Sequence, residues 1–329
     1  MKVCVYLGFI LWKNKSLVLC VLIMLVLGCL IALIPITPVK LTIYRVCCSV
    51  TSGVRCLYDC LDKKLSGLNE RKIEEKAYQN EGDEVKHKLA VLVPFRDRFD
   101  ELLEFVPHMH KFLKKQNVNH HIFVLNQIDS YRFNRASLIN VGFREVCPQC
   151  DYIAMHDVDL LPLNPQLSYG YPEKGPFHVA SPQLHPRYNY STFAGGILLI
   201  KREDFQKVNG MSNKYWGWGL EDDEFYIRLK EAKLQISRPQ NVTPGKTNTF
   251  RHMHDSVRRK RDKTRCFSQM QLTDDRDLET GLNTVSYKLT EIREMSIDGD
   301  RATVLNVKLH CDKLLTPWCE CNSSNQSAH

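Results

Sequence analysis

Apolar and polar positions fall into long blocks along the chain, and the first block is the most apolar. Residues 16–34, SLVLCVLIMLVLGCLIALI, carry no charge and are long enough to cross a bilayer core, which takes about 20 apolar residues. The run exceeds the apolar part of a cleaved signal peptide and lacks a small-residue cleavage site. We therefore predict a cytosolic tail over 1–15 and an uncleaved transmembrane signal anchor over 16–36.

A polar segment follows the predicted anchor and ends abruptly. Residues 37–87 contain several cysteines and then many charged residues but few apolar ones, which is typical of a stem rather than a packed domain. Apolar positions become regular from residue 88 onward, and we place a folded domain at 88–321 and a short tail at 322–329. Basic residues lie on both sides of the predicted anchor, so their bias favours a cytosolic amino terminus only weakly.

Within the predicted domain, short apolar runs alternate with segments that have helical spacing. We predict strands and helices at 89–94, 101–115, 121–125, 134–143, 152–155 and 222–233. This alternation indicates an α/β open sheet, in which ligands bind at the carboxyl ends of strands. The polar residues Arg96, Arg98, Asp157 and Asp159 follow strands, so we expect them at a ligand site. Neither a G-x-G-x-x-G after the first strand nor a P-loop motif is present, which argues against dinucleotide oxidoreductases and P-loop enzymes.

Two short motifs could form a metal site. Asp157 and Asp159 are two residues apart, as are His252 and His254, and in extended backbone such pairs share a face. The two aspartates can then approach one cation or one ribose, and the two histidines can both bind a metal. A carboxylate with two imidazoles leaves room for phosphate oxygens and suits Mn²⁺ better than a closed thiolate zinc site. A zinc hydrolase is the competing interpretation, but its H-E-x-x-H pattern is missing.

The run WGWGLEDDEF at 216–225 combines aromatic residues, glycines and acids. Glycines between tryptophans allow tight turns that bring aromatic faces against a sugar ring. The acids Glu221, Asp222 and Asp223 open the predicted helix, where its dipole alone would favour them, but the dipole does not explain the preceding aromatic residues.

Charge and cysteine content narrow the setting. The net charge of +8 is spread along the chain, which suits an anionic ligand such as a nucleotide sugar or a polyanionic product, and no nucleic-acid-binding signature is present. The C-x-x-C at Cys147–Cys150 lacks a second ligand pair for zinc, so we expect a disulfide in an oxidising compartment. Near the carboxyl terminus we predict two further bridges, Cys311–Cys319 and Cys266–Cys321. Among the N-x-S/T triplets, Asn241 is the one we expect to carry a glycan.

Six blocks, in this order, resemble the β-1,4-galactosyltransferase family: VPFRDRF (93–99), FNRASLINVGF (133–143), DVDLLPLN (157–164), GGILLI (195–200), WGWGLEDDEF (216–225) and FRHMHD (250–255). The resemblance covers roughly residues 88–321. His156 before the DVD and the close H-x-H are similar to the branch that acts on protein-linked xylose. Lactose-type members instead supply a methionine and a histidine three residues apart at the metal.

The resemblance implies a GT-A fold with a single catalytic domain and a Mn²⁺-dependent, inverting reaction. Galactose would move from UDP-galactose to the 4-hydroxyl of xylose on proteoglycan core proteins, in glycosaminoglycan linker synthesis. The protein would be a single-pass type II protein of the Golgi membrane with a lumenal catalytic domain. Two alternatives stay open at this point, a relative that acts on N-acetylglucosamine and a catalytically inactive, membrane-bound sugar-binding protein.

The resemblance also assigns site residues position by position. Uracil and ribose would be held by Pro94, Phe95, Arg96, Asp97, Arg98, Phe133, Asn134 and Arg135. Nucleotide, metal, diphosphate and donor sugar would be contacted by Val158, Asp159, Tyr188, Trp218, His252, Met253, His254 and Arg261, with Asp159, His252 and His254 as the metal ligands. The acceptor would meet Leu220, Glu221, Asp222 and Asp223, with Asp222 as the base, which the amino terminus of the predicted helix would hold ionised. Leu220 and Phe193 stand where some members of the branch carry arginine and tyrosine.

Overall fold

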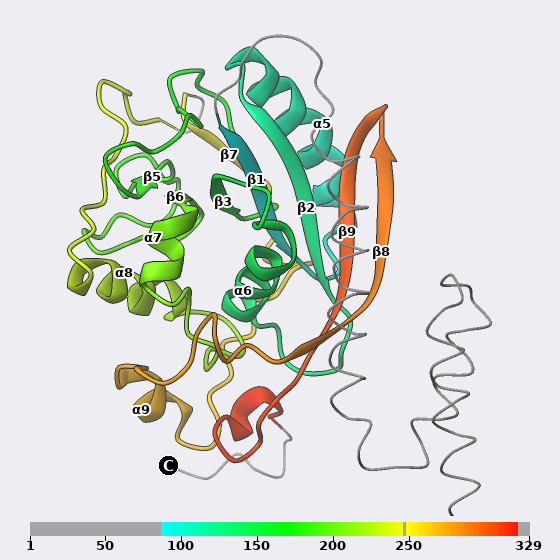
Figure 1. The fold of residues 1–329 in the computed structure, drawn as a ribbon, viewed down its shortest axis with the longest axis vertical. Coiled ribbons are helices and arrows are strands. Elements are labelled where there is room, and N and C mark those ends of the chain that lie inside the picture. The colour runs from blue at the N-terminus through cyan, green and yellow to red at the C-terminus, as the bar shows by residue number, and fades with distance from the viewer. Residues whose placement is uncertain (1–86, 246–247, 322–329) are drawn as a thin grey trace, which may run out of the picture. The chain divides into compact units, whose positions relative to one another are not determined.

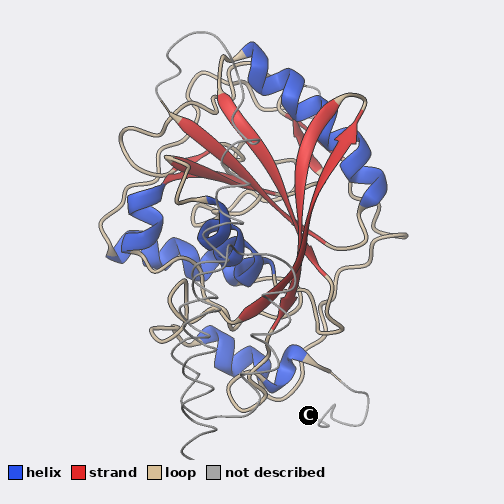
Figure 2. Cartoon of the chain, turned by 45° about the vertical axis from the view of Figure 1, so that its right-hand side comes forward, coloured by secondary structure: helices blue, strands red, loops and turns tan. Residues whose placement is uncertain are grey.

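The computed structural model describes residues 87–245 and 248–321. The predicted cytosolic tail, the anchor, nearly all of the stem and the carboxyl-terminal tail lie outside the described residues. No helix in the described ranges combines the length and apolar character that crossing a bilayer requires. The described residues form an α/β structure in which helices flank a central sheet (Figure 2).

A seven-stranded mixed sheet with the order β5-β6-β3-β1-β2-β9-β8 forms the centre of the fold (Figure 1). Its strands are β1 (Lys88–Phe95), β2 (Asn119–Gln127), β3 (Tyr152–His156), β5 (Phe177–His178), β6 (Ile197–Lys201), β8 (Tyr287–Ile297) and β9 (Asp300–Leu309). β1 runs parallel to both β2 and β3, and β2 runs parallel to β9, whereas β5, β6 and β8 are antiparallel to their neighbours. The three predicted strands are confirmed and lie next to one another in the sheet.

The helices are α5 (Phe99–Lys115), α6 (Arg135–Val146), α7 (Arg202–Lys207), α8 (Glu221–Glu231) and α9 (Gln269–Asp274), with a 3-10 turn η1 (Pro317–Cys319). The predicted helices at 101–115, 134–143 and 222–233 correspond to α5, α6 and α8. α6 begins after Asn134, whose side chain accepts a hydrogen bond from the backbone N–H of Ser137 and so caps the helix. α8 begins one residue earlier and ends two residues earlier than predicted.

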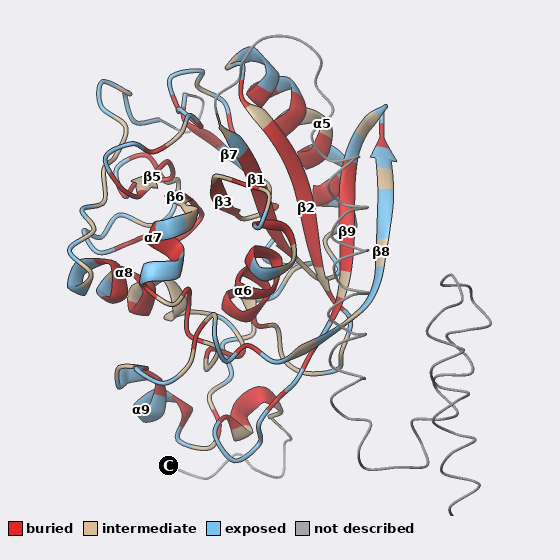
Figure 3. Ribbon diagram, viewed as in Figure 1, coloured by how far each residue is buried: buried red, intermediate tan, exposed pale blue. Residues whose placement is uncertain are grey.

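The central strands are apolar throughout because both faces of the sheet are covered. Leu92 of β1 packs with α6 residues on one face, whereas Val91 and Val93 pack with α5 residues such as Phe105 on the other. Figure 3 shows β1 and most of β2 as buried along with the inner sides of α5 and α6. Burial on both faces explains why these strands read as continuous apolar runs rather than as alternating patterns.

A separate two-stranded sheet, which the sequence did not predict, brings distant motifs together. β4 (Leu160–Pro162) pairs antiparallel with β7 (Phe250–His252), and Leu160 lies opposite His252 in the register. The backbone N–H of Met253 donates a 2.8 Å hydrogen bond to the carbonyl of Asp159, which extends the pairing by one step. The DVD and H-x-H motifs, about ninety residues apart in the sequence, are therefore neighbours in space.

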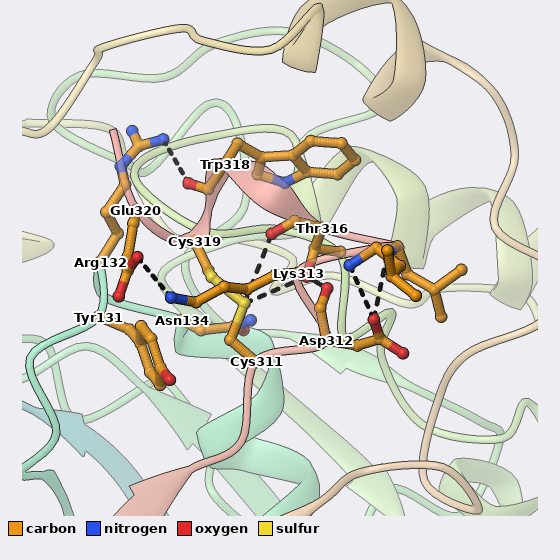
Figure 4. Close-up of a disulfide and its surroundings, with 12 residues drawn as sticks. Tyr131, Arg132, Asn134, Cys311, Asp312, Lys313, Thr316, Trp318, Cys319 and Glu320 are labelled. Carbon is orange, nitrogen blue, oxygen red and sulfur yellow. Dashed lines mark hydrogen bonds and ion pairs between the residues drawn. A yellow bond between two sulfur atoms is a disulfide. The ribbon is translucent and has the colours of Figure 1, made fainter. Parts of the chain in front are cut away.

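All three predicted disulfides are present in the structure: Cys147–Cys150, Cys266–Cys321 and Cys311–Cys319. Figure 4 shows the last of these joining the chain just after β9 to η1, beside an ion pair between Lys313 and Glu320. The indole N–H of Trp318, one residue before Cys319, donates to the carbonyl of Lys214 at 2.8 Å. The bridge therefore ties the end of β9 to η1, which in turn contacts the segment that leads into α8.

Candidate active site

An open cavity of about 530 Å³ lies at the carboxyl ends of β1 and β3, as expected for an α/β sheet. The loop after β1 supplies Arg96 and Arg98, and the turn after β3 supplies Asp157 and Asp159. The remaining walls come from the start of α6, the loop at 185–196, the start of α8 and the segment after β7. The cavity is thus built from segments that are far apart in the sequence.

Seventeen of the twenty predicted site residues line this cavity: Pro94, Arg96, Asp97, Arg98, Phe133, Arg135, Val158, Asp159, Tyr188, Trp218, Leu220, Glu221, Asp222, Asp223, His252, His254 and Arg261. Phe95, Asn134 and Met253 do not line it. Asn134 is fully buried, and its side chain caps α6 and donates to the carbonyl of Asn213 at 2.9 Å. The side chains of Phe95 and Met253 pack against the core on the α5 side of the sheet. These three side chains support the walls rather than face the cavity.

Several cavity residues had no signal in the sequence, namely His185, Lys260, Asp262 and Arg265. His185 accepts hydrogen bonds at Nδ1 from the backbone N–H groups of Arg187 and Tyr188, both at 3.0 Å. A single histidine in a loop gives no period or spacing from which its position could be found, and the basic run that contains Lys260 does not indicate which of its members line the cavity. Gly195 and Gly196 also line the cavity, and here the GGILLI block was an available signal.

Three potential metal ligands meet at the junction of β4 and β7. Oδ2 of Asp159 lies 3.4 Å from Nδ1 of His254 and 3.8 Å from Nε2 of His252. Burial lowers the pKa of His252, which favours the neutral imidazole that binds a metal. Burial alone would raise the pKa of Asp159, but a hydrogen bond with His254 and the nearby charges of both histidines and Arg98 lower it on balance. The donor set of one carboxylate and two imidazoles fits a divalent transition metal.

The three side chains are near one another without being arranged around a single point. The imidazole rings of His252 and His254 are stacked, with their centroids 5.7 Å apart. Across the described ranges, no group of three or more histidine, cysteine, aspartate or glutamate side chains is positioned to hold a metal ion as it stands.

The two carboxylates of the DVD motif have separate partners, which differs from the expectation that both approach one cation or one ribose. β3 ends at His156, and residues 157–159 form a turn rather than extended strand. Oδ1 of Asp157 accepts a 2.8 Å hydrogen bond from Nε of Arg135, whereas Asp159 faces the histidines. In this turn Asp157 pairs with Arg135 of α6, and Asp159 remains available to bind a metal.

The WGWG run turns the chain into α8 by left-handed backbone conformations. The φ angles of Gly217 and Gly219 are +90° and +103°, and that of Leu220 is +75°. Trp216 is buried in the core, but Trp218 is 39% exposed and lines the cavity. The expectation of tight turns is confirmed, with one tryptophan serving the core and the other facing the cavity.

Asp222 lies in the first turn of α8 with its carboxylate close to Gly195. Burial raises its pKa to about 8, with further increases from the neighbouring charges of Glu221 and Asp223 and a partial opposing effect from Arg135. The expectation that the helix end alone holds Asp222 ionised is wrong, because burial and two adjacent carboxylates outweigh the helix dipole. A carboxylate with a raised pKa is a stronger base once it loses its proton.

Aromatic rings form one wall of the cavity. The ring of Tyr188 lies 5.2 Å from that of Phe193 and 6.5 Å from that of Trp218. The guanidinium of Arg261 lies 4.9 Å from the Trp218 ring centre and 5.7 Å from that of Tyr188. Aromatic faces beside a fixed cation and an acidic helix start suit a sugar ring that carries a phosphate group.

Comparison with known proteins agrees with this geometry. The family model described as the N-terminal region of glycosyl transferase group 7 matches residues 61–171, and the one described as the N-terminal domain of galactosyltransferase matches residues 175–255. β-1,4-Galactosyltransferase 7 of Drosophila melanogaster is 59% identical over 243 residues, which cover 74% of this chain and 76% of the relative. Xylosylprotein 4-beta-galactosyltransferase of Caenorhabditis elegans is 51% identical over 71% of this chain and 82% of its own.

Two solved structures of the Drosophila enzyme share the fold. Its catalytic domain in complex with xylobiose has a TM-score of 0.71 and 60% identity, covering 72% of this chain and all of that one. A mutant in complex with manganese, UDP-Gal and xylobiose has a TM-score of 0.71, 59% identity and the same coverage. The fold and cavity thus define a glycosyltransferase with a GT-A-like α/β fold. The chain belongs to the β-1,4-galactosyltransferase family, in its xylosylprotein 4-β-galactosyltransferase branch.

Proposed function

We propose that this protein transfers galactose from UDP-galactose to the 4-hydroxyl of xylose on proteoglycan core proteins, with inversion at the anomeric carbon and dependence on Mn²⁺. The observation that carries the proposal is that the Asp159, His252 and His254 cluster opens into the same cavity as Asp222. A donor sugar held between these two groups would have its leaving group on one side and a base on the other. The relatives' names and the ligands of the Drosophila structures support the same reaction.

Asp159, His252 and His254 would hold the manganese ion. When bound, the ion would supply a Lewis acid that neutralises charge on the departing diphosphate. Arg261 adds a cation on the same wall, next to Tyr188 and Trp218, and would contact the diphosphate.

The nucleotide would lie along the ends of β1 and β2. Arg96 donates hydrogen bonds to the carbonyls of Gln127, Asp129 and Tyr131, so its guanidinium fixes the turn after β2 instead of reaching freely into the cavity. The same guanidinium lies 5.9 Å from the ring centre of Phe133, a cavity residue with an apolar face for a base. We infer that Phe133 stacks on uracil while Arg96 holds the surrounding backbone in place.

Asp222 would accept the proton in the chemical step. The acceptor oxygen forms a bond to the anomeric carbon, the bond from that carbon to the phosphate oxygen breaks with its electron pair leaving on UDP, and the hydroxyl proton passes to a carboxylate oxygen of Asp222. Because attack and departure occur on opposite faces in one displacement, a single base is enough and the configuration inverts. Arg135, which is paired with Asp157, would partly offset the effects that raise the pKa of this base.

The aromatic wall would select the acceptor. Tyr188, Tyr190, Phe193 and Trp218 crowd the cavity beside α8, and the hydroxyl of Tyr190 donates to Asp223 at 3.4 Å. Xylose lacks the hydroxymethyl and N-acetyl groups of larger sugars, so bulky rings at these positions would admit it and clash with N-acetylglucosamine.

For the chain as a whole we propose a single-pass type II Golgi membrane protein with its anchor at 16–36, a stem at 37–87 and a lumenal catalytic domain at 88–321. Three disulfides in the catalytic domain support an oxidising compartment. Asn241 is exposed and lies in a loop, as a glycan acceptor must.

The proposed activity is tested by measuring radioactive galactose transfer to a small β-xyloside, with Mn²⁺ and after its removal by a chelator. We expect transfer only with Mn²⁺, and a reduction of roughly 10²–10⁴-fold in kcat for Asp222→Asn. UDP binding should survive in that variant. Transfer by Asp222→Asn at the parent rate would rule out Asp222 as the base.

A further inference from the structure

The segment after the H-x-H motif is strongly basic, and part of its charge is already neutralised. Residues 258–265, RRKRDKTR, include six basic side chains. Nη2 of Arg258 lies 2.7 Å from Oδ2 of Asp100, and Nε of Arg259 lies 2.9 Å from Oε1 of Glu101. These two ion pairs fasten the segment to the start of α5, so Arg258 and Arg259 are not available to a ligand.

Of the four other basic residues, Lys260, Arg261 and Arg265 line the cavity, and Arg261 is the one stacked on its aromatic rings. Arg261 lies over Trp218 and Tyr188, where it would meet the diphosphate. Lys260, Lys263 and Arg265 remain, and in the described part of the chain no ion pair joins any of them to a carboxylate. We call these three residues the basic rim.

Two residues of the basic rim, Lys263 and Arg265, lie against Trp218. Nζ of Lys263 lies 5.2 Å from the centre of the Trp218 ring, and Nη2 of Arg265 donates to the Trp218 carbonyl at 3.3 Å. Lys260 and Arg265 line the cavity, and the side chains of Lys260 and Lys263 are exposed. The acid within this segment, Asp262, pairs with Arg132. The basic rim therefore carries positive charge that an anionic ligand would balance.

The position of the rim relative to Asp222 indicates which ligand it would meet. Trp218 precedes Asp222 by four residues, and both line the same cavity. A xylose whose hydroxyl reaches Asp222 would be attached at its other end to a protein that must stay outside the cavity. Arg261 is the cation that we place at the diphosphate of the donor. The basic rim therefore remains for the acceptor protein.

We propose that the basic rim binds acidic side chains of the core-protein peptide that flank the xylosylated residue. This inference rests on the proposed galactosyltransferase function and adds a preference for acidic peptide acceptors. Charge complementarity between exposed lysines and carboxylates would lower KM for such peptides, and it would weaken as salt screens the charges. The rim would leave kcat unchanged because it does not touch the reacting atoms.

The test compares three acceptors with the intact catalytic domain and its disulfides. They are a xylosylated peptide with flanking glutamates, the same peptide with glutamines instead, and a small neutral β-xyloside. Lys263→Glu reverses one rim charge, and Lys174→Glu is the matched control because Lys174 is exposed and outside the cavity. Melting temperatures of both variants report whether they remain folded.

For Lys263→Glu we expect KM of the acidic peptide to rise by roughly three- to ten-fold at low salt, with less effect at high salt. KM of the neutral xyloside and of UDP-galactose should stay near the parent values, as should all constants of Lys174→Glu. A rise in KM for UDP-galactose would show that the rim binds the donor and would overturn the proposal, as would equal effects on the glutamate and glutamine peptides. A parent enzyme that uses none of the three acceptors would contradict the proposed function itself.

Discussion

The α-carbon of Gly195 faces the carboxylate of Asp222 so closely that a Cβ at this position would overlap Oδ2 of Asp222. The same Cβ would also press on the ring of Phe193. A glycine in the GGILLI block therefore leaves the space that the carboxylate of Asp222 occupies, so the loop before β6 and the start of α8 depend on each other through close packing.

Gly195→Ala should displace the base without removing it. We expect kcat to fall by roughly 10- to 100-fold, because small displacements of a reacting group are costly, while KM for UDP-galactose changes little. Gly170→Ala is the control, since a Cβ there would make only an ordinary contact with Ser168. Steady-state kinetics on both variants check this. Turnover at the parent rate in Gly195→Ala would show that Asp222 can accommodate the added methyl group without losing its function.

The raised pKa of Asp222 predicts a pH dependence. A base must be unprotonated, so with a pKa of about 8 the value of kcat/KM should rise by about tenfold per pH unit on the acidic side and level off above pH 8. Glu221→Gln removes one of the charges that raise this pKa, so its profile should shift to lower pH. Glu231→Gln, at the other end of α8, should not shift it. An acidic limb that stays in place in Glu221→Gln would exclude Asp222 as the titrating group.

The three metal ligands can be tested one at a time. Asp159→Ala, His252→Ala and His254→Ala should each raise the Mn²⁺ concentration for half-maximal activity by at least about tenfold, because each removes one of few protein ligands. His310→Ala, an exposed histidine outside the cavity, should titrate like the parent. Direct Mn²⁺ binding by electron paramagnetic resonance separates lost affinity from lost catalysis. If the activity of all three variants depends on Mn²⁺ concentration as in the parent, these residues are not the metal ligands.

We expect a disulfide that closes a longer loop to stabilise the domain more than one that closes a shorter loop. Cys311–Cys319 spans 8 residues and Cys266–Cys321 spans 55. Chain entropy gives about 2–3 kcal/mol for the shorter loop and about 4 kcal/mol for the longer one. Replacing both cysteines of a pair by serine should therefore lower the melting temperature more for Cys266 and Cys321. Calorimetry under non-reducing conditions measures both melting temperatures. A larger decrease for the Cys311 and Cys319 pair would mean that native packing around η1 outweighs loop entropy.

The sequence was sufficient to predict the elements whose signal is local. The runs that became β1, β2 and β3 are apolar on both faces, and α5 has clear helical spacing, so each was found to within a few residues. β4 and β7 have three residues each and exist because they pair with one another, which no local pattern reveals. Their pairing is what places Asp159 beside His252 and His254.

The electrostatics of the site could not be predicted from the sequence either. The motif suggested that Asp157 and Asp159 act together, but the turn after β3 gives Asp157 to Arg135. Helix position suggested an ionised Asp222, whereas its pKa depends on burial and on Glu221, which only the folded structure defines. The six family blocks supplied most cavity residues, but not His185 or Lys260, which lie outside those blocks.

The most direct test of the proposed function is a comparison of acceptors under one condition, with saturating UDP-galactose and Mn²⁺. The parent catalytic domain is given a β-xyloside or a β-N-acetylglucosaminide with the same aglycone, and kcat/KM is measured for each. The aromatic wall of Tyr188, Tyr190, Phe193 and Trp218 predicts efficient transfer to the xyloside and little to the N-acetylglucosaminide. Comparable values of kcat/KM for the two acceptors would contradict the assignment of xylose as the acceptor.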